Sequence, residues 1–212
     1  MISEEAVAES NWRVRAANTK KTRTLNKILL SAQKLFESCD YDEVSIEKIA
    51  AGAAVGPATI YQRFATKGAL AAAVLAKSIS GYDDLVEQDI NSIGVLGALH
   101  AHLERLANLV KNNYKLARAV FIANSFTEGP PTSPHDPRLL LPLPRHVAQI
   151  LDRGVQQGLL HVPTTPNDTA GSIVSALLVR IVARDETAKQ SSDFIFSLIT
   201  TGLLVEKDLI HF

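Results

Sequence analysis

The sequence predicts an all-α protein: an N-terminal three-helix domain with a helix-turn-helix, then a larger C-terminal helical domain, with about nine helices in all. Two observations support this. Apolar residues recur at three- and four-residue steps through most of the chain, as they do along one face of a helix. Positive charge is concentrated in residues 11–77, where eleven Lys/Arg and five Asp/Glu give a net charge of +6, whereas residues 78–212 carry −3.

The helix-turn-helix is predicted in residues 45–64, SIEKIAAGAAVGPATIYQRF. Ser45 is placed as an N-cap, and Gly56-Pro57 starts a second helix, since proline suits the first helical position. The apolar face of the first helix consists of Ile46, Ile49, Ala50 and Ala53. The second helix points Ile60 and Phe64 inward and leaves small or hydrogen-bonding groups outward, namely Pro57, Ala58, Thr59, Tyr61 and Gln62. Such an outward face is typical of a helix that reads the DNA major groove.

Residues 22–75 resemble the DNA-binding domain of the TetR family of transcriptional regulators. The resemblance rests on the apolar helix ILLSAQKLF, the SIEKIA opening, the VGPATIYQRF recognition segment and the TKGAL start of a following helix. Three residues depart from the family pattern: Asp40 and Ala54 each replace a glycine, and Gly56 replaces a capping serine. The resemblance implies a regulator, expected to be a repressor. It would bind a near-palindromic operator in double-stranded DNA as a homodimer and be released by a small-molecule effector.

Candidate DNA-binding residues follow from the motif and from the resemblance. We expect Thr59 and Gln62 to reach bases or nearby phosphates. Phosphates are the expected partners of Thr22, Tyr61 and Lys67, the last of which lies in the first turn of a predicted helix. The full set is Thr22, Thr24, Ser45, Gly56, Pro57, Ala58, Thr59, Tyr61, Gln62 and Lys67.

The predicted domains are a flexible basic arm at 1–20, the helix-turn-helix domain at 21–67, and a helical ligand-binding and dimerisation domain at 68–212. The first helix is expected from about Thr22 to Ser38. From Arg13 to Lys27 there are six bases and no acid. Such a segment either follows a DNA backbone or enters a minor groove, or it is a frayed terminus without a partner, and both interpretations stay open here.

The composition limits the class of protein. A hydrophobic content of 46% in 212 residues is enough for a buried core. No stretch approaches about 20 uninterrupted apolar residues, so no membrane span is predicted. The single cysteine, Cys39, excludes an internal disulfide. Together with an acidic N-terminus unlike a secretion signal, it predicts a cytoplasmic protein.

Further helices are predicted beyond the helix-turn-helix domain. They cover about 66–80 or 66–89, 92–113, 115–126, 138–157 or 144–157, 167–184 and 191–205, with a proline-rich loop at 128–137. The last two carry more apolar surface than we expect one chain to cover, which predicts a homodimer; the alternative is burial within the chain. In the resembled family the corresponding helix pair forms a four-helix dimer interface. The candidate interface residues are Ile173, Leu177, Ile181, Ile195, Leu198, Ile199 and Leu203.

The resemblance also implies a cavity for an apolar effector in the C-terminal domain. Apolar side chains would line it and a few polar groups would anchor the ligand. The candidate residues are Leu99, His102, Leu103, Leu106, Phe121, Ser125, Phe126, His146 and Ile150.

Metal, cofactor and enzyme chemistry find little support in the sequence. His100 and His102 are two residues apart, so on a helix they point in different directions, and the other histidines occur singly. No glycine-rich loop carries the lysine of a phosphate site, and no carboxylate pair marks a catalytic centre. We therefore expect no metal, no cofactor and no enzymatic activity.

Three other classes of protein remain open. A winged-helix regulator would need a basic hairpin after the recognition helix, where TKGALAAAVLAK instead predicts a helix. The remaining two are a ligand-binding helical protein without a DNA-binding role and a helical enzyme.

Overall fold

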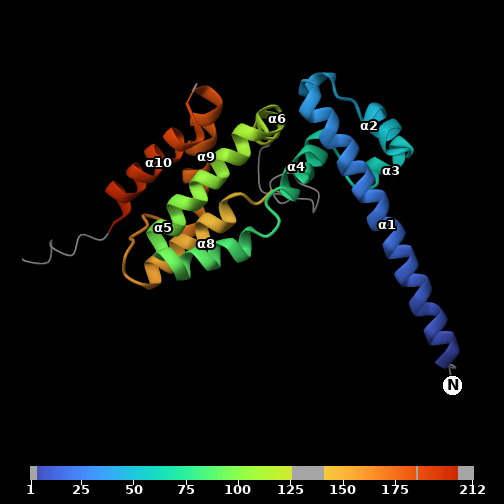
Figure 1. Ribbon diagram of the computed structural model, residues 1–212, viewed down its shortest axis with the longest axis horizontal. Coiled ribbons are helices and arrows are strands. Elements are labelled where there is room, and N and C mark those ends of the chain that lie inside the picture. The colour runs from blue at the N-terminus through green and yellow to red at the C-terminus, as the bar shows by residue number, and fades with distance from the viewer. Residues whose placement is uncertain (1–3, 126–140, 185, 205–212) are drawn as a thin grey trace, which may run out of the picture.

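The computed structural model describes residues 4–125, 141–184 and 186–204. These residues form nine α-helices, one short 3-10 helix and an isolated bridge between Leu160 and Leu204, which confirms the predicted all-α class. Figure 1 shows two lobes: an N-terminal lobe with α1 to α4, and a C-terminal lobe with α5 to α10. The proline-rich loop predicted at 128–137 lies outside the described residues.

The N-terminal lobe is built on one long helix and three short ones. Its elements are α1 (Glu4–Ser38), the 3-10 helix η1 (Tyr41–Glu43), α2 (Ile46–Ala53), α3 (Pro57–Tyr61) and α4 (Lys67–Lys77). Ile28 and Phe36 of α1, Ile49 of α2, Ile60 of α3 and Leu70 of α4 are all fully buried. These helices therefore share one core, which fixes the position of α3.

Helix α1 starts at Glu4 rather than near Thr22, so it extends through the segment expected to be an arm. Residues 4–21 contain no glycine and no proline, and they are rich in Ala, Glu, Lys and Arg, which favour a helix. Periodicity missed this extension because an apolar stripe marks only the half of α1 that meets the core.

The C-terminal lobe consists of α5 (Tyr82–Asn112), α6 (Tyr114–Ser125), α8 (Pro144–Gln156), α9 (Pro166–Ala183) and α10 (Ala188–Leu203). Helix α5 runs through the predicted break near residue 90 and kinks at Gly94, whose φ of 75° only glycine adopts without strain. Helix α5 packs against α8, α9 and α10, while α4 packs against both α1 and α6. Helices α4 and α6 thus join the two lobes. Among the described helices, none combines the length and the apolar character that crossing a membrane requires.

Candidate DNA-binding surface and effector cavity

The turn between α2 and α3 has the geometry of a helix-turn-helix. The Oγ of Ser45 accepts a hydrogen bond from the Lys48 amide at 3.2 Å, which confirms the predicted N-cap. Ala54 ends α2 in the left-handed region, at φ 55° and ψ 48°. Pro57 then occupies the first position of α3. Because Ile60 is buried, the orientation of α3 is fixed and its other faces point outward.

The outward residues of α3 lie together on one surface. Tyr61 is 52% exposed, Pro57, Ala58 and Gln62 are exposed, and Thr59 is half-buried. The structure therefore places four of these predicted residues on α3 and the fifth, Gln62, at its C-cap, on a surface that no described part of the chain covers.

Thr22 and Thr24 lie in the middle of α1 rather than at its start. The Oγ1 of Thr24 donates to the Lys20 carbonyl at 3.0 Å, one turn earlier in the helix. The expectation of a helix N-terminus with free N–H groups at Thr22 is therefore wrong, because α1 continues back to Glu4. Arg63, which the sequence analysis did not single out, donates from Nη2 to the Lys21 carbonyl at 3.3 Å. This bond ties the end of α3 to α1.

Lys67 has partners inside the N-terminal lobe. Its Nζ donates to the carbonyl oxygens of Tyr41 at 2.6 Å and Val44 at 2.9 Å. It also lies 4.1 Å from the centroid of the Tyr41 ring. Burial, and secondarily the Asp42 carboxylate, raises the pKa of Tyr41 above its ordinary value. Two of the three ammonium donors of Lys67 therefore hold the start of α4 against η1, a pairing that no local sequence pattern indicates.

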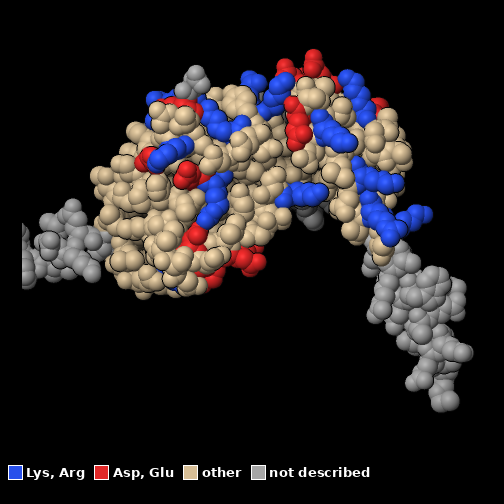
Figure 2. Space-filling model, in the orientation of Figure 1, with Lys and Arg blue, Asp and Glu red and all other residues tan. Residues whose placement is uncertain are grey.

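Basic side chains are distributed unevenly over the surface. Figure 2 shows Lys and Arg gathered on the N-terminal lobe where α1 leaves it, whereas both signs of charge are mixed on the C-terminal lobe. The described bases at that point are Lys20, Lys21, Arg23 and Lys27, all exposed. A phosphate backbone requires such a surface next to a recognition helix.

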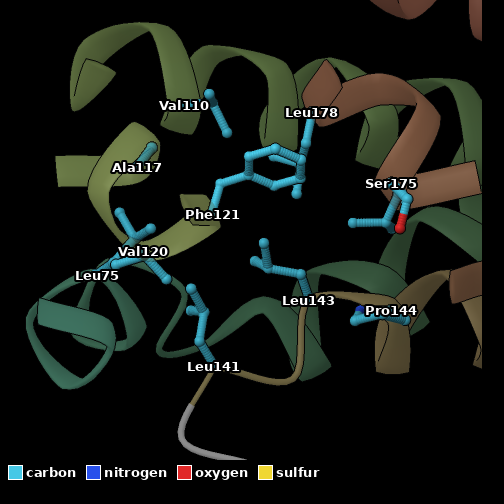
Figure 3. Close-up of a pocket in the computed structure, with 11 residues that line it drawn as sticks. Leu75, Val110, Ala117, Val120, Phe121, Leu141, Leu143, Pro144, Ser175 and Leu178 are labelled. Carbon is cyan, nitrogen blue, oxygen red and sulfur yellow. The ribbon is translucent and has the colours of Figure 1, made fainter. Parts of the chain in front are cut away.

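The C-terminal lobe contains an apolar cavity of about 280 Å³. Figure 3 shows Phe121 projecting from α6 into its middle, with Val110, Leu178 and Leu143 around the ring. Among the described lining residues, Ser175 alone has a polar side chain. The lining residues come from α4, α5, α6, α8, α9 and the segment before α8, and are Leu75, Val110, Ala117, Val120, Phe121, Leu141, Leu143, Pro144, Val174, Ser175 and Leu178.

Among those predicted ligand-binding residues whose side chains the structure describes, only Phe121 lines this cavity. Leu99, Leu103, Leu106 and Ile150 are buried in the common core instead. The side chain of Ser125, and all of Phe126, lie outside the described part of the structure. An apolar stripe identifies the inner face of a helix but does not distinguish residues packed in a core from residues that border a cavity.

His102 and His146 form a buried polar cluster beside the core. Their ring centroids are 5.3 Å apart, the edge of Tyr82 packs on His102, and the Nε2 of His146 lies 3.2 Å from the Asp83 carboxylate. Burial, helped by the neighbouring His146 and Arg105, lowers the pKa of His102 to about 3, so this ring is neutral at pH 7. Within the described residues no group of three or more His, Cys, Asp or Glu side chains is arranged to hold a metal ion.

The predicted dimer residues divide into two sets. Ile173, Leu177, Ile181, Ile195 and Ile199 are buried in the core of their own chain, Leu203 is half-buried and Leu198 is 56% exposed. The outer faces of α9 and α10 expose two further large apolar side chains, Val179 at 49% and Phe194 at 44%. The apolar stripes of α9 and α10 are wide enough to reach both the core and the surface. Their periodicity alone does not separate the inner face of each helix from the outer face.

Comparison with known proteins identifies the N-terminal lobe. Residues 28–74 match the family described as bacterial regulatory proteins, tetR family. Residues 28–74 thus form a DNA-binding domain of the TetR type. The matched family consists of regulatory proteins, which agrees with the prediction of a DNA-binding regulator without enzymatic activity. No protein of curated function matches the chain by sequence.

Solved structures of transcriptional regulators and of RolR share the fold over most of the chain. Thermus thermophilus FadR, a TetR-family repressor solved with lauroyl-CoA, is 18% identical with a TM-score of 0.73, over 89% of this chain and 99% of that one. Bacillus subtilis FadR, a transcriptional regulator solved with stearoyl-CoA, is 16% identical with a TM-score of 0.60, over 83% and 97%. RolR, solved with resorcinol, is 17% identical with a TM-score of 0.63, over 86% and 90%. Because all three structures are less than 20% identical to this chain, the similarity shows a shared fold alone.

Proposed function

We propose that this protein is a repressor that binds a near-palindromic operator as a homodimer and is released by a small apolar effector. The observation that supports the proposal is that two helices connect the effector cavity to the lobe that binds DNA. Helices α4 and α6 border the cavity and also pack against the lobe that presents α3. In this proposal residues 21–67 form the DNA-binding domain and residues 68–212 the effector and dimerisation domain.

The proposed DNA contacts centre on α3. Thr59 and Gln62 read bases, and the Tyr61 hydroxyl donates a hydrogen bond to a phosphate oxygen. Pro57 and Ala58 allow close approach to the groove. Ser45 and Gly56 hold the starts of α2 and α3, and Thr22 and Thr24 face the backbone from the side of α1. Lys67 keeps α4 on η1, with one ammonium donor left for a phosphate.

The homodimer is proposed to form through the outer faces of α9 and α10, which pack against each other. On α9, Ala176 and Val179 are exposed, and on α10, Phe194 and Leu198 are exposed. The guanidinium of Arg180 stacks on the Phe194 ring at 3.6 Å, which orders this surface. Two copies related by a two-fold axis would bury both faces and present two α3 helices about 34–36 Å apart, or somewhat more, on the duplex.

The proposed effector is a small apolar molecule with a single hydrogen-bonding group. A cavity of about 280 Å³ is slightly smaller than typical ligand sites, which span about 300–1,000 Å³. Ser175 is placed to bind one polar atom. The structural relatives with resorcinol and with acyl-CoA show that this fold holds both an aromatic ring and a fatty acyl compound. We therefore propose a substituted aromatic ring or a medium-length acyl chain.

The effector is proposed to act through α6 and α4. Ala117, Val120 and Phe121 of α6 and Leu75 of α4 line the cavity, so a ligand that displaces Phe121 moves both helices. Just before Ala117 on the same helix, the Nζ of Lys115 lies 3.0 Å from the Asp40 carboxylate, next to η1. Movement of α6 thus reaches the lobe that carries α3. A coupling of about 1–3 kcal/mol between the two sites changes operator affinity by about 5- to 150-fold.

Selection of bound duplexes from a random DNA pool tests the central claim. We expect an enriched near-palindrome with two half-sites, and Gln62→Ala and Thr59→Ala variants that select different sequences. Tyr61→Phe should bind every sequence more weakly while preserving the preference. Absence of any enriched sequence would contradict the proposed function.

The effector is tested separately, by thermal-shift screening with substituted phenols and medium-chain acyl compounds, followed by operator titration. We expect hits to raise the melting temperature and weaken operator binding. Phe121→Ala should alter affinity for the hits without changing operator binding in their absence. Ligands that occupy the cavity but leave operator affinity unchanged would refute the release mechanism.

A further inference from the structure

The two imidazoles beside the C-terminal core leave buried polar atoms without partners. His102 is fully buried and His146 is 4% exposed. Among the described residues, neither ring nitrogen of His102 has a hydrogen-bond partner, and the same holds for Nδ1 of His146 and Nη1 of Arg105. A buried polar atom left unpaired costs about 1–3 kcal/mol. Several such atoms at one place therefore indicate a role other than stability.

The fold does not depend on these imidazoles, because ion pairs already hold the surrounding helices. Helix α5 folds back at Gly94 and brings Asp89 onto Arg105 in an ion pair, although sixteen positions of a straight helix would span about 24 Å. Residues 82–93 therefore pack against the later part of α5 and against α8. The acid–base pairs that attach them are Asp89–Arg105, Asp83–Arg145 and Glu87–Arg153.

The unpaired atoms include both donors and acceptors. Burial lowers the pKa of both imidazoles, so both rings are neutral at pH 7. The Nε2 of His146 lies 3.2 Å from a carboxylate oxygen of Asp83, so it carries the ring proton and leaves Nδ1 as an acceptor. A neutral His102 offers one N–H and one lone pair, and Nη1 of Arg105 offers N–H groups. A ligand group for this site must therefore both accept and donate hydrogen bonds.

The charges around the two imidazoles are balanced. The ion pairs formed by α5, α8, α9, α10 and the turn between the last two are Asp83–Arg145, Glu87–Arg153, Asp89–Arg105, Arg180–Glu186, Asp193–Lys189 and Asp193–His100. Burial raises the pKa of Tyr82, so its hydroxyl stays neutral. An anion alone would therefore add an uncompensated buried charge, which is strongly disfavoured. A carboxylate that enters with one proton adds no net charge.

The two imidazoles adjoin the effector cavity. Pro144, which lines the cavity (Figure 3), precedes His146 by two residues in α8, or about 3 Å along the helix axis. The Tyr82 ring packs on both imidazoles, with centroids 5.7 Å from His102 and 6.0 Å from His146. A ligand whose apolar part fills the cavity therefore has this polar group of residues close to one end.

We propose that His102, His146 and Arg105 form a binding site for a carboxyl group, which enters together with one proton taken from solvent. Its oxygens accept hydrogen bonds from Nη1 of Arg105 and from His102, and the added proton joins an oxygen to a ring nitrogen. Two sources offer this chemistry: the polar end of the apolar effector, and a separate small acid. Where the effector is the source, this inference rests on the function proposed above.

The proton uptake has a measurable consequence. His102 has a pKa of about 3 in the free protein and a carboxylic acid one of about 4.3, so neither carries the proton at about pH 6–7. The complex holds one proton, so the observed affinity should fall close to tenfold for each unit of pH between about 5.5 and 7. An alcohol enters neutral, and its affinity should not depend on pH in this range.

The test is calorimetric titration of the full-length protein with octanoic acid, 1-octanol and acetic acid. Titrations in two buffers of different ionisation enthalpy count the protons taken up on binding. His102→Leu removes the carboxyl site and keeps the cavity, and His161→Leu, at an exposed position, is the matched control. Circular dichroism and a melting curve check that both variants fold. Titration of the operator with and without each acid is measured separately.

We expect octanoic acid to bind with uptake of close to one proton, and about tenfold more weakly at pH 7 than at pH 6. 1-Octanol should bind without proton uptake. His102→Leu should weaken octanoic acid at least about tenfold and leave 1-octanol unchanged, whereas His161→Leu should alter neither. If the effector is the source, octanoic acid should bind at least about a hundredfold more tightly than acetic acid. Similar affinities of the two acids would identify a separate small acid.

Three results overturn the proposal: octanoic acid binds without proton uptake, it binds equally to the wild type and to His102→Leu, or neither acid binds up to about 10 mM at pH 6. The first two leave the apolar effector cavity in place. An acid that binds with proton uptake and leaves operator affinity unchanged supports the site and contradicts the release mechanism, so the two failures are distinguishable. The buffer comparison uses the unaltered protein, so it decides the question even if a variant folds poorly.

Discussion

The Nζ of Lys67 lies 2.6 Å from the carbonyl oxygen of Tyr41 and 4.1 Å from the centroid of the same residue's ring. A second bond, to the Val44 carbonyl at 2.9 Å, completes the attachment of α4 to the segment between α1 and α2. A lysine that sequence analysis places on a phosphate thus forms its hydrogen bonds within its own domain. The recognition helix depends on this attachment, since α4 follows α3 directly.

Replacement of Lys67 by Met should lower the free energy of unfolding by about 2–3 kcal/mol, because two charge-assisted hydrogen bonds are removed. The slope of log affinity against log salt should also become shallower by about 0.9 per subunit, because the third ammonium donor is proposed to bind a phosphate. Lys48→Met is the matched control, since its exposed Nζ donates a single bond to the Glu43 carbonyl at 2.9 Å; we expect a decrease below about 1 kcal/mol. Urea unfolding measures the change in stability of both variants. Unchanged stability with a reduced salt slope would show that Lys67 binds a phosphate but does not hold α4 in place.

Ala54 adopts a left-handed conformation that favours glycine, with φ at 55°. This conformation costs a residue with a Cβ about 1–2 kcal/mol, whereas glycine loses about 0.4–1 kcal/mol through the greater freedom of the unfolded chain. Ala54→Gly should therefore stabilise the protein by about 0.5–1 kcal/mol. Ala51→Gly, exposed within α2, should instead destabilise it by about 1 kcal/mol. Two changes of the same sign in urea unfolding would contradict this account of the turn.

His102 makes stability depend on pH in the acid range. Its pKa is about 3 in the folded protein and about 6.5 in the unfolded chain, so between these values the unfolded chain binds one more proton. Stability therefore decreases as the pH falls from 6.5 toward 3, by about 2–3 kcal/mol at pH 4.5. Burial also lowers the pKa of the neighbouring His146, which acts in the same direction.

His102→Leu should remove most of this decrease and leave stability at pH 7 equal or higher, because both ring nitrogens lack a hydrogen-bond partner among the described residues. Unfolding free energies of the wild type and the variant at pH 7 and pH 4.5 provide the measurement. His161→Leu, at an exposed position, should change nothing. A wild-type-minus-variant difference that is the same at both pH values would refute the role of His102.

Leu198 lies on the outer face of α10 and is 56% exposed in a single chain. Leu198→Asp should weaken the dimer at least about a hundredfold, since a charge in an apolar contact loses its hydration. Operator affinity should fall with it, because one α3 helix alone binds a single half-site. Sedimentation measures the dimer constant. Ile93→Asp, at a residue 55% exposed on α5, is the control, and equal effects of the two changes would place the interface elsewhere.

The class of fold and the position of the recognition helix follow from the order of the residues alone. Ile46, Ile49, Ile60 and Phe64 repeat at helical spacing around a Gly-Pro start, and each of them is buried in the structure. A cap was also predictable: Ser45 accepts the expected backbone hydrogen bond. These features are local, since a cap or an apolar stripe depends on residues within a few positions along the chain.

Which of the predicted residues lie together depends instead on how the helices pack in three dimensions. Phe121 borders the cavity whereas Leu103 is packed in the core, Leu177 faces inward whereas Val179 faces outward, and Lys67 turns back to Tyr41. Phe121 and Leu103 are both large and apolar, and so are Leu177 and Val179. Spacing along the chain therefore does not distinguish the two members of either pair. Neighbours contributed by distant helices make the difference, because burial and hydrogen bonding depend on what lies across the interface between helices.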